Sequence, residues 1–190
     1  MIKIIVLIVC LSIFPAFELF QAAEKKVDIL FHQKVRVRDA VILNVDVYKP
    51  SGMTKPLPAL FVFTPYTTDG FYKDAMFYTR HGYVVVIGDI RGRGNSGGEW
   101  TPFEFEGKDG FDICAWISEQ NWCNGEIGMF GGSYVGMVQW LILKEKPPAL
   151  KTIVPTATVC PGVDFPMQNN IFYTYNTQWL AFTLGQTLNR

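Results

Sequence analysis

The chain has 190 residues, of which 49% are hydrophobic and 15% aromatic. This composition excludes an intrinsically disordered protein and suffices for one domain with a packed core. Lysine plus arginine and aspartate plus glutamate number 17 each, and no basic run or stripe occurs, which argues against a nucleic-acid partner.

The first residues are typical of a secretory signal peptide. A short positive start precedes an almost entirely apolar run over 4–14, and small residues follow at Ala22 and Ala23. This layout predicts a signal peptide over 1–23 and a secreted or periplasmic protein that meets the membrane only transiently. The apolar run is too short for a comfortable membrane span, and an uncleaved anchor is the alternative.

Three cysteines remain after this segment, Cys114, Cys123 and Cys160. An odd number allows at most one internal disulfide and leaves one free thiol. Cys123 and Cys160 lie in loop-like surroundings and could pair, whereas Cys114 lies in a helical run and is expected to be buried. No cysteine spacing fits a zinc site, and we expect neither a metal nor a cofactor.

Alternating polar and apolar residues predict an N-terminal pair of antiparallel strands. Residues 27–31 and 34–38 have the pattern of strands, 38–40 that of a hairpin turn, and 41–48 that of a strong strand. Continuous apolar runs, typical of strands covered on both faces, follow at 59–64, 83–89, 127–131 and 150–155.

Helical segments separate the apolar runs, at 72–81, 108–119 and 135–146. Buried strands that alternate with amphipathic helices indicate an α/β fold with a mostly parallel sheet and helices on both faces. The order fits the start of an α/β-hydrolase sheet over 24–160. Residues 161–190 are rich in aromatic residues among polar ones, which we interpret as the start of a helical cap; ordinary core packing is the alternative.

Glycines bracket a serine between an apolar strand and a helix, in the run Gly131-Gly132-Ser133-Tyr134-Val135-Gly136. This is the context of a nucleophile elbow, in which the serine hydroxyl projects above the sheet edge and helix N–H groups face its target. The second glycine comes one residue later than in the general G-x-S-x-G pattern. The alternative is a glycine-rich turn with an unreactive serine N-cap.

Several separated segments together resemble the cocaine-esterase and X-prolyl dipeptidyl-peptidase (CocE/NonD) group of serine hydrolases, which also includes α-amino-acid ester hydrolases and glutaryl acylases. The resemblance covers residues 34 to 190. The matching segments are Arg38-Asp39, Asp46-Val47-Tyr48-Lys49-Pro50, Thr64-Pro65-Tyr66, Gly82-Tyr83-Val84-Val85-Val86, 89–99, Asp112, Trp116-Ile117, Trp122-Cys123-Asn124-Gly125 and 131–136.

The resemblance implies roles for three residues. Ser133 matches the nucleophile, the backbone N–H of Tyr134 matches one oxyanion donor, and the hydroxyl of Tyr66 matches the other. Tyr66 follows a predicted strand and Pro65, which stiffens the loop, so its hydroxyl can be directed at the oxyanion. The alternative for Tyr66 is an aromatic ring at an interface with its hydroxyl in water.

For the acidic residues of the intervening loops, a structural role is favoured over a catalytic one. Asp89 ends a strand, where a pair with Arg91 or a hydrogen bond that holds the loop is favoured over chemistry. Glu104, Glu106 and Asp109 could line the opening of a site, but a solvated loop is the favoured account.

The general base and the acid that serine hydrolysis requires are missing from the expected positions. The only histidines, His32 and His81, precede Ser133, whereas α/β-hydrolases place both partners after the serine. His81 closes a helix, where it can cap carbonyls. Asp164 follows the serine but precedes the cap aromatics, so it is not assigned. We therefore expect a truncated product, of marginal stability and with little or no esterase activity alone.

The favoured function is a serine hydrolase whose full-length form cleaves an ester or amide through an acyl-serine intermediate. Its substrate would be a small molecule, such as a Xaa-Pro dipeptide, an amino-acid ester or another acyl compound. One alternative is a catalytically incomplete fragment with no turnover or only a binding role. Another is an acyl-group binding protein that uses the aromatic segment after Phe165.

Overall fold

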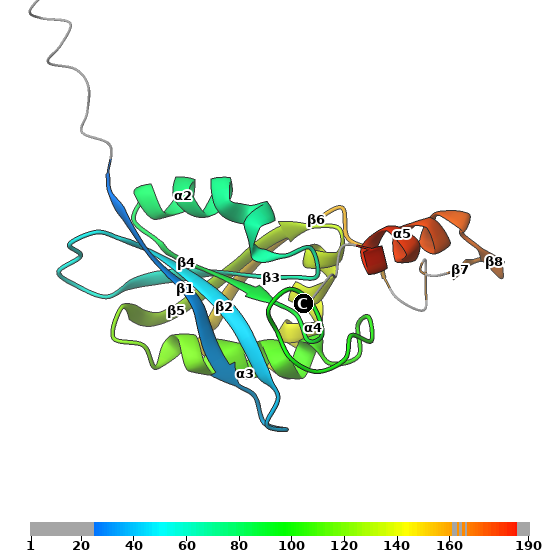
Figure 1. Ribbon diagram of the computed structural model, residues 1–190, viewed down its shortest axis with the longest axis horizontal. Helices are drawn as coiled ribbons and strands as arrows, with labels where there is room; N and C mark the ends of the chain where they lie inside the picture. The colour runs from blue at the N-terminus through cyan, green and yellow to red at the C-terminus, as the bar shows by residue number, and fades with distance from the viewer. Residues whose placement is uncertain (1–24, 161–162, 164, 166, 186–190) are drawn as a thin grey trace, which may run out of the picture.

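The computed structural model describes residues 25–160, 163, 165 and 167–185. A six-stranded sheet forms its centre, with strand order β1-β2-β4-β3-β5-β6 (Figure 1). The sheet strands are β1 (Val27–Arg36), β2 (Ile42–Pro50), β3 (Leu57–Thr64), β4 (Val84–Asp89), β5 (Cys123–Gly132) and β6 (Leu150–Thr156). The helices are η2 (Thr68–Phe71), α2 (Tyr72–Arg80), α3 (Glu106–Ser118), α4 (Tyr134–Glu145) and α5 (Thr174–Gly185).

The N-terminal antiparallel pair is a hairpin of β1 and β2, and the turn predicted at 38–40 joins the two strands. The two short strands predicted at 27–31 and 34–38 are one strand with an irregular register between Leu30 and Gln33. His32 lies inside this irregularity in the left-handed region, with φ of 56°. Its backbone N–H donates to Asp46 Oδ1 at 2.8 Å, so a side chain replaces the missing strand partner.

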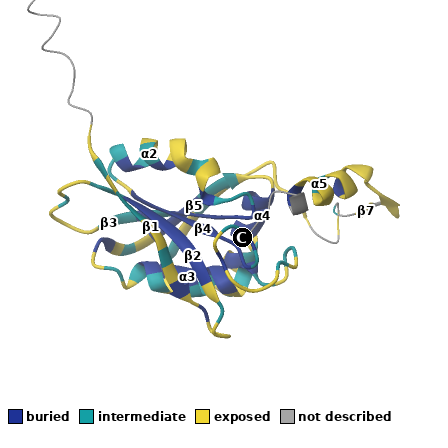
Figure 2. Ribbon diagram, in the orientation of Figure 1, coloured by how far each residue is buried: buried dark blue, intermediate teal, exposed yellow. Residues whose placement is uncertain are grey.

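The strands from β3 onward form the predicted parallel sheet. β3 pairs in parallel with β4 and β5, and β5 pairs in parallel with β6, while β2 joins β4 in antiparallel fashion. All of β4 is buried, as its continuous apolar run predicts (Figure 2). The register places Thr64 beside Asp89 and Gly132 beside Thr156, so the carboxyl ends of these strands meet at one edge.

Helices cover both faces of the sheet, which confirms the predicted α/β class. Ala75 of α2 packs with Val62 and Val85 in one cluster of buried side chains. Ile113 of α3 and Val138 of α4 pack with Phe61, among others, in a second and larger cluster. Burial of each such valine, isoleucine or phenylalanine side chain stabilises the fold by roughly 1.5–3 kcal/mol.

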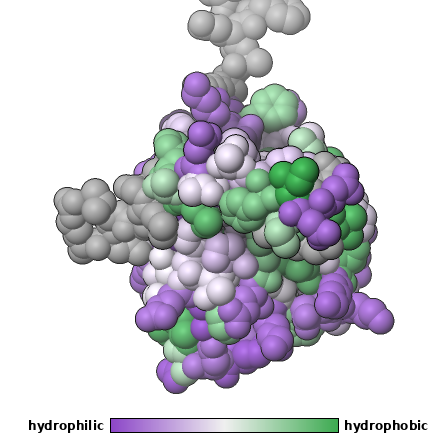
Figure 3. All heavy atoms as spheres, turned by 90° about the vertical axis from the view of Figure 1, so that its right-hand side faces the viewer, coloured by the Kyte–Doolittle hydropathy of each residue, from purple (hydrophilic) through white to green (hydrophobic). Residues whose placement is uncertain are grey.

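The segment predicted to begin a cap contains a short hairpin of β7 (Met167–Gln168) and β8 (Ile171–Phe172), followed by α5. This segment lies at one end of the molecule in Figure 1, beyond the main body of the sheet. Figure 3 views that end and shows hydrophobic side chains gathered in one part of the surface. Large hydrophobic side chains that are exposed in this segment are Val163, Met167, Ile171, Phe172, Tyr173, Tyr175, Leu180 and Phe182.

The cysteines of the described ranges are all thiols. Cys114 is buried within α3, as predicted, while Cys123 is buried and Cys160 is exposed, so the suggested pairing of these two is absent. Cys10 and the predicted signal peptide lie outside the described residues. Among the helices of the described residues, none combines the length and the apolar character needed to cross a membrane.

Candidate active site

A strained backbone turn presents Ser133 between β5 and α4. Ser133 is the N-cap of α4 and has φ of 57° and ψ of −124°, a conformation that non-glycine residues rarely adopt. Two backbone hydrogen bonds hold it: its N–H donates to Thr156 O at 2.9 Å, and its carbonyl accepts from Met137 N at 3.0 Å. The surrounding strands and helix therefore fix the strained residue at the carboxyl edge of the sheet.

The glycines around Ser133 explain the departure from the usual spacing. Gly131 has φ of +135°, and a Cβ there would lie 2.5 Å from Val135 Cγ1. The general pattern would have a glycine at position 135. Here Val135 stands at that position, and its side chain is buried. At Gly136 a Cβ would approach Thr156 O to 3.1 Å, because α4 passes close to the end of β6 there. The close approach falls at position 136, which is where the glycine stands.

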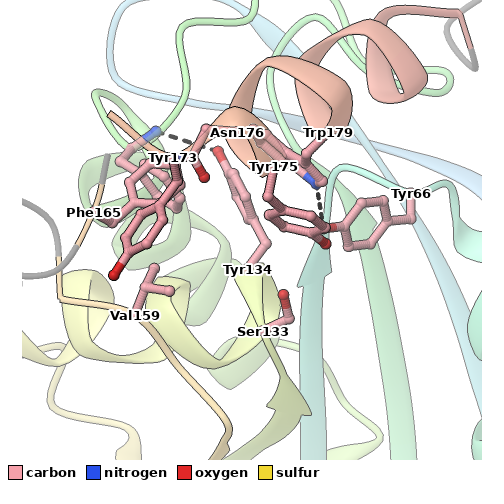
Figure 4. Close-up of a pocket in the computed structure, with 10 residues that line it drawn as sticks. Tyr66, Ser133, Tyr134, Val159, Phe165, Tyr173, Tyr175, Asn176 and Trp179 are labelled. Carbon is pink, nitrogen blue, oxygen red and sulfur yellow. Dashed lines mark hydrogen bonds between the residues drawn. The ribbon is translucent and has the colours of Figure 1, made fainter. Parts of the chain in front are cut away.

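The structure brings Ser133, Tyr66 and Tyr134 to one cavity of about 290 Å³ (Figure 4). Figure 4 shows the Ser133 side chain at the end of its strand, pointing into the cavity, with Tyr66 and Tyr134 nearby. Aromatic side chains make most of the wall. The remaining lining residues are Phe103, Val159, Phe165, Tyr173, Tyr175, Asn176 and Trp179.

Tyr66 follows the end of β3, and its hydroxyl is held inside the cavity. Its backbone N–H donates to Thr64 Oγ1 at 3.0 Å, and its hydroxyl accepts a hydrogen bond from Trp179 Nε1 at 3.1 Å. Burial raises the pKa of the phenol, and hydrogen bonds with Trp179 and Ser133 partly offset this rise. Because the hydroxyl accepts from Trp179, its own proton is left to point at a further acceptor.

Tyr134 is the first residue of α4, so its backbone N–H belongs to the turn that lacks intrahelical partners. Its ring stacks against Phe103 at 4.2 Å and Trp179 at 5.7 Å between centroids. Its hydroxyl donates to Glu106 Oε1 and accepts from Trp100 Nε1 at 3.3 Å and Phe103 N at 3.2 Å. Both the side chain and the backbone of Tyr134 are thereby fixed.

The interpretation of Glu106 and Asp109 as residues of a solvated loop is wrong, although Glu104 is exposed as expected. Glu106 is 3% exposed and binds the Tyr134 hydroxyl. Burial raises the pKa of Glu106, and the bond from Tyr134 lowers it. Both acids lie in the first turn of α3, where the helix dipole and N–H groups favour carboxylates.

The suggested pair of Asp89 with Arg91 is also wrong. Arg91 binds Asp109 through two hydrogen bonds of 2.9 and 2.7 Å and Asp39 through one of 2.7 Å. These bonds tie the β1–β2 hairpin to α3. The alternative role for Asp89, a hydrogen bond that holds the loop, is confirmed, since its Oδ2 accepts from Asn95 N at 3.0 Å.

Neither histidine of the chain lines the cavity. His81 Nδ1 contacts Phe77 O at 2.7 Å, which confirms the predicted capping of a helix carbonyl. His32 Nδ1 lies 3.9 Å from Asp46 Oδ1, on the hairpin. Asp164 lies outside the described residues. Within the described ranges, no group of three or more histidine, cysteine or acidic side chains is placed to hold a metal ion.

Trp179 and Phe103 are site residues that the sequence does not reveal, although Trp179 belongs to the aromatic-rich segment 161–190. Trp179 contacts Tyr66 across 113 residues of chain, and Phe103 stacks on Tyr134 from an irregular loop. Periodicity detects patterns within one helix or strand, so contacts made by a loop or between segments far apart in the sequence leave no such signal.

The open sheet, its helices and the strand–serine–helix turn define an α/β-hydrolase fold. The chain belongs to the X-Pro dipeptidyl-peptidase (S15) family, which it matches over residues 39–190.

Proteins similar in sequence include both esterases and peptidases. The cocaine esterase of Rhodococcus sp. (strain MB1 Bresler) is 39% identical over 128 residues, covering 64% of this chain and 22% of the relative. The Xaa-Pro dipeptidyl-peptidase of Lactobacillus helveticus (strain DPC 4571) is 24% identical over 147 residues, covering 67% and 17%. The chain thus spans about a fifth of the length of these two relatives.

Solved structures agree with this fold. An α-amino acid ester hydrolase superposes with a TM-score of 0.74 at 25% identity, over 86% of this chain and 31% of that one. A CocE/NonD family hydrolase from Staphylococcus aureus superposes with a TM-score of 0.70 at 23% identity, over 85% and 34%. These superpositions confirm the resemblance noted from the sequence motifs.

Proposed function

We propose that this chain carries the nucleophile and oxyanion hole of a serine hydrolase that cleaves a small ester, amide or dipeptide. The observation that supports this most is the strained Ser133, whose side chain points into the same cavity as the Tyr66 hydroxyl and lies at the N-terminus of α4. Relatives named as an esterase and as a dipeptidyl-peptidase are consistent with attack on an acyl carbonyl.

In this proposal Ser133 Oγ bonds to the carbonyl carbon while its proton passes to a general base. The carbonyl oxygen becomes an anion, and the Tyr134 backbone N–H and the Tyr66 hydroxyl donate to it. The bond to the leaving oxygen or nitrogen then breaks, the leaving group takes a proton, and water hydrolyses the acyl-serine. The preorganised hydroxyl of Tyr66 and the fixed backbone of Tyr134 suit this task because neither must reorganise as charge develops.

One observation favours the second candidate, a catalytically incomplete chain. Both histidines are described, and neither lines the cavity that contains Ser133. No described carboxylate lines it either. Without a base, Ser133 would not be activated, and the aromatic cavity would serve binding alone.

A fluorophosphonate probe separates these candidates. Such a probe bonds covalently to an activated serine, so labelling at Ser133 that disappears in Ser133→Ala supports the hydrolase. Turnover of a p-nitrophenyl ester by the 190-residue chain, lost in Ser133→Ala, would show that the chain is complete as a catalyst. Binding of the ester without labelling or turnover would support the incomplete chain.

We also propose that the protein is exported through the signal peptide predicted over 1–23. The support is the layout of a positive start, an apolar run and small residues at Ala22 and Ala23. N-terminal sequencing of the protein from an expressing bacterium tests this, with a new N-terminus after Ala22 or Ala23 expected. An intact Met1 in the membrane fraction would indicate an uncleaved anchor.

A further inference from the structure

Arg93 is a buried cation in the loop after β4, within the run Arg91-Gly92-Arg93-Gly94 that the proposed function leaves unexplained. It is 1% exposed. Its neighbours on both sides are glycines in the left-handed region, with φ of 67° at Gly92 and 53° at Gly94. A Cβ at Gly92 would lie 2.3 Å from Trp100 N, so the loop folds too tightly for other residues. The sharp loop is what places the Arg93 side chain in the interior.

The guanidinium of Arg93 joins two parts of the cavity wall. Its Nε donates to Pro65 O at 3.0 Å, the carbonyl directly before Tyr66. Its Nη2 donates at 2.8 Å to the carbonyl oxygen of Thr183 in α5, the helix that also contains Trp179. The loop that holds the Tyr66 hydroxyl and the helix that binds this hydroxyl are therefore fastened to the same side chain.

Arg93 also supports the aromatic rings of the cavity. Its guanidinium carbon lies 4.5 Å above the ring centre of Trp100. Trp100 in turn donates to the Tyr134 hydroxyl and packs against Trp179 with centroids 5.8 Å apart. Contacts of Arg93 thus extend to both residues assigned as oxyanion donors, one through a backbone carbonyl and one through an indole.

The charge of Arg93 distinguishes it from its neighbour Arg91. Arg91 forms ion pairs with Asp39 and Asp109, whereas within the described ranges no carboxylate forms an ion pair with Arg93. An arginine stays protonated at all ordinary pH values, so a positive charge is held here in direct contact with carbonyl dipoles and a ring face. Burial lowers the pKa of Arg93, and the charge of Asp89, with which it forms no ion pair, partly offsets this.

We propose that Arg93 is a positioning residue of this site, which holds the Tyr66 hydroxyl in place and supplies to the oxyanion hole a positive charge that is not tied up in an ion pair. This inference rests on the proposed function. In the resting protein the charge costs stability, because a buried cation without a carboxylate in an ion pair is unfavourable. When a substrate oxygen becomes negative, the same charge attracts it in a low-dielectric cavity. Arg93 also lowers the pKa of the Tyr66 phenol, though less than burial raises it, which makes the phenol a better donor.

The test compares substitutions that separate charge from fit. Arg93→Met removes the charge and keeps an apolar stem over Trp100, while Arg93→Lys keeps the charge and loses the planar fork. Arg91→Lys is the matched control, a buried arginine of the same loop whose partners are acids. Should Arg93→Met not fold, Arg93→Gln takes its place, since it is neutral but keeps N–H donors for a carbonyl.

Two readouts are measured on the full chain. The first is the pKa of a fluorotyrosine placed at position 66, followed by ¹⁹F NMR, since this phenol titrates at lower pH than tyrosine. The second is the second-order rate of fluorophosphonate bonding to Ser133. The neutral variants should raise the pKa of the phenol. They should also slow the labelling about tenfold or more, which is less than the slowing expected from loss of a whole oxyanion donor. Arg93→Lys should leave the pKa near its original value and slow the labelling less.

Arg91→Lys should lower the unfolding midpoint and change neither readout. An unchanged phenol pKa in the neutral Arg93 variants would overturn the inference, and so would an equal change in Arg91→Lys. If the unsubstituted chain is not labelled at all, the proposed hydrolase activity fails, while the titration of the phenol still decides whether Arg93 acts on Tyr66.

Discussion

Removal of a single oxygen from Tyr66 separates catalysis from folding at this site. In Tyr66→Phe the ring stays, but the donor assigned to the oxyanion is lost. Loss of one such donor costs about 3–4 kcal/mol of barrier, or a factor of roughly 10²–10³ in rate. The folded state loses the acceptor of the Trp179 indole N–H and the hydrogen bond between the Tyr66 hydroxyl and Ser133. Since Trp179 is half-buried, water replaces part of the first bond, and the stability cost is about 1–2 kcal/mol.

The assay is the rate of Ser133 modification by a fluorophosphonate, together with urea unfolding of the same samples. Tyr83→Phe is the matched control, because Tyr83 directly precedes β4 and so lies at the opposite end of the parallel strands from Tyr66. It should leave the modification rate unchanged. A Tyr66→Phe protein that reacts as fast as the original, at similar stability, would refute the assignment of this hydroxyl to the oxyanion hole.

Three further predictions concern the fold around the site. Gly131→Ala should destabilise the protein by about 1–3 kcal/mol in urea unfolding, because a Cβ at φ of +135° would overlap a side chain of α4; Gly125→Ala, at φ of +86° in open space, should cost less, and equal costs would contradict this account. Burial raises the pKa of Glu106 above its unfolded value of 4.5, so its contribution to stability is present below that pH and is lost as pH rises through the folded pKa. Glu106→Gln should accordingly flatten the decline of the urea midpoint above about pH 4.5, and an unaltered slope would count against it. Iodoacetamide should modify the exposed Cys160 in the native protein, whereas Cys114, whose pKa burial raises to about 12, should be protected until unfolding, as mass spectrometry of peptides will show.

Strands, helices and the elbow could be predicted because they depend on short-range patterns. The buried strands were found from continuous apolar runs, and β4 and β6 match the prediction within one residue at each end. The break expected between 31 and 34 is real at His32, but the strand continues past it, because Asp46 satisfies the displaced N–H. A side chain 14 residues away cannot be read from local alternation.

The errors at the site have a common physical cause. Glu106 and Asp109 are charged residues at a helix start, where solvent exposure is the usual expectation, and Arg91 was expected to pair with its near neighbour Asp89. In the structure these charges are buried because each finds a specific partner: Tyr134 for Glu106, and Asp109 for Arg91. Such pairing depends on which segments the topology brings together, and a single sequence does not contain that information in its local pattern.

The backbone of Ser133 has one more consequence, which concerns the evolution of this chain. At φ of 57° and ψ of −124° a glycine has less backbone strain than any residue with a side chain. A glycine there would thus relieve roughly 1–3 kcal/mol of strain and stabilise the chain, at the cost of the hydroxyl that we propose as the nucleophile. Drift without selection for chemistry would favour that exchange, so a serine at this position is what the proposed role of nucleophile predicts.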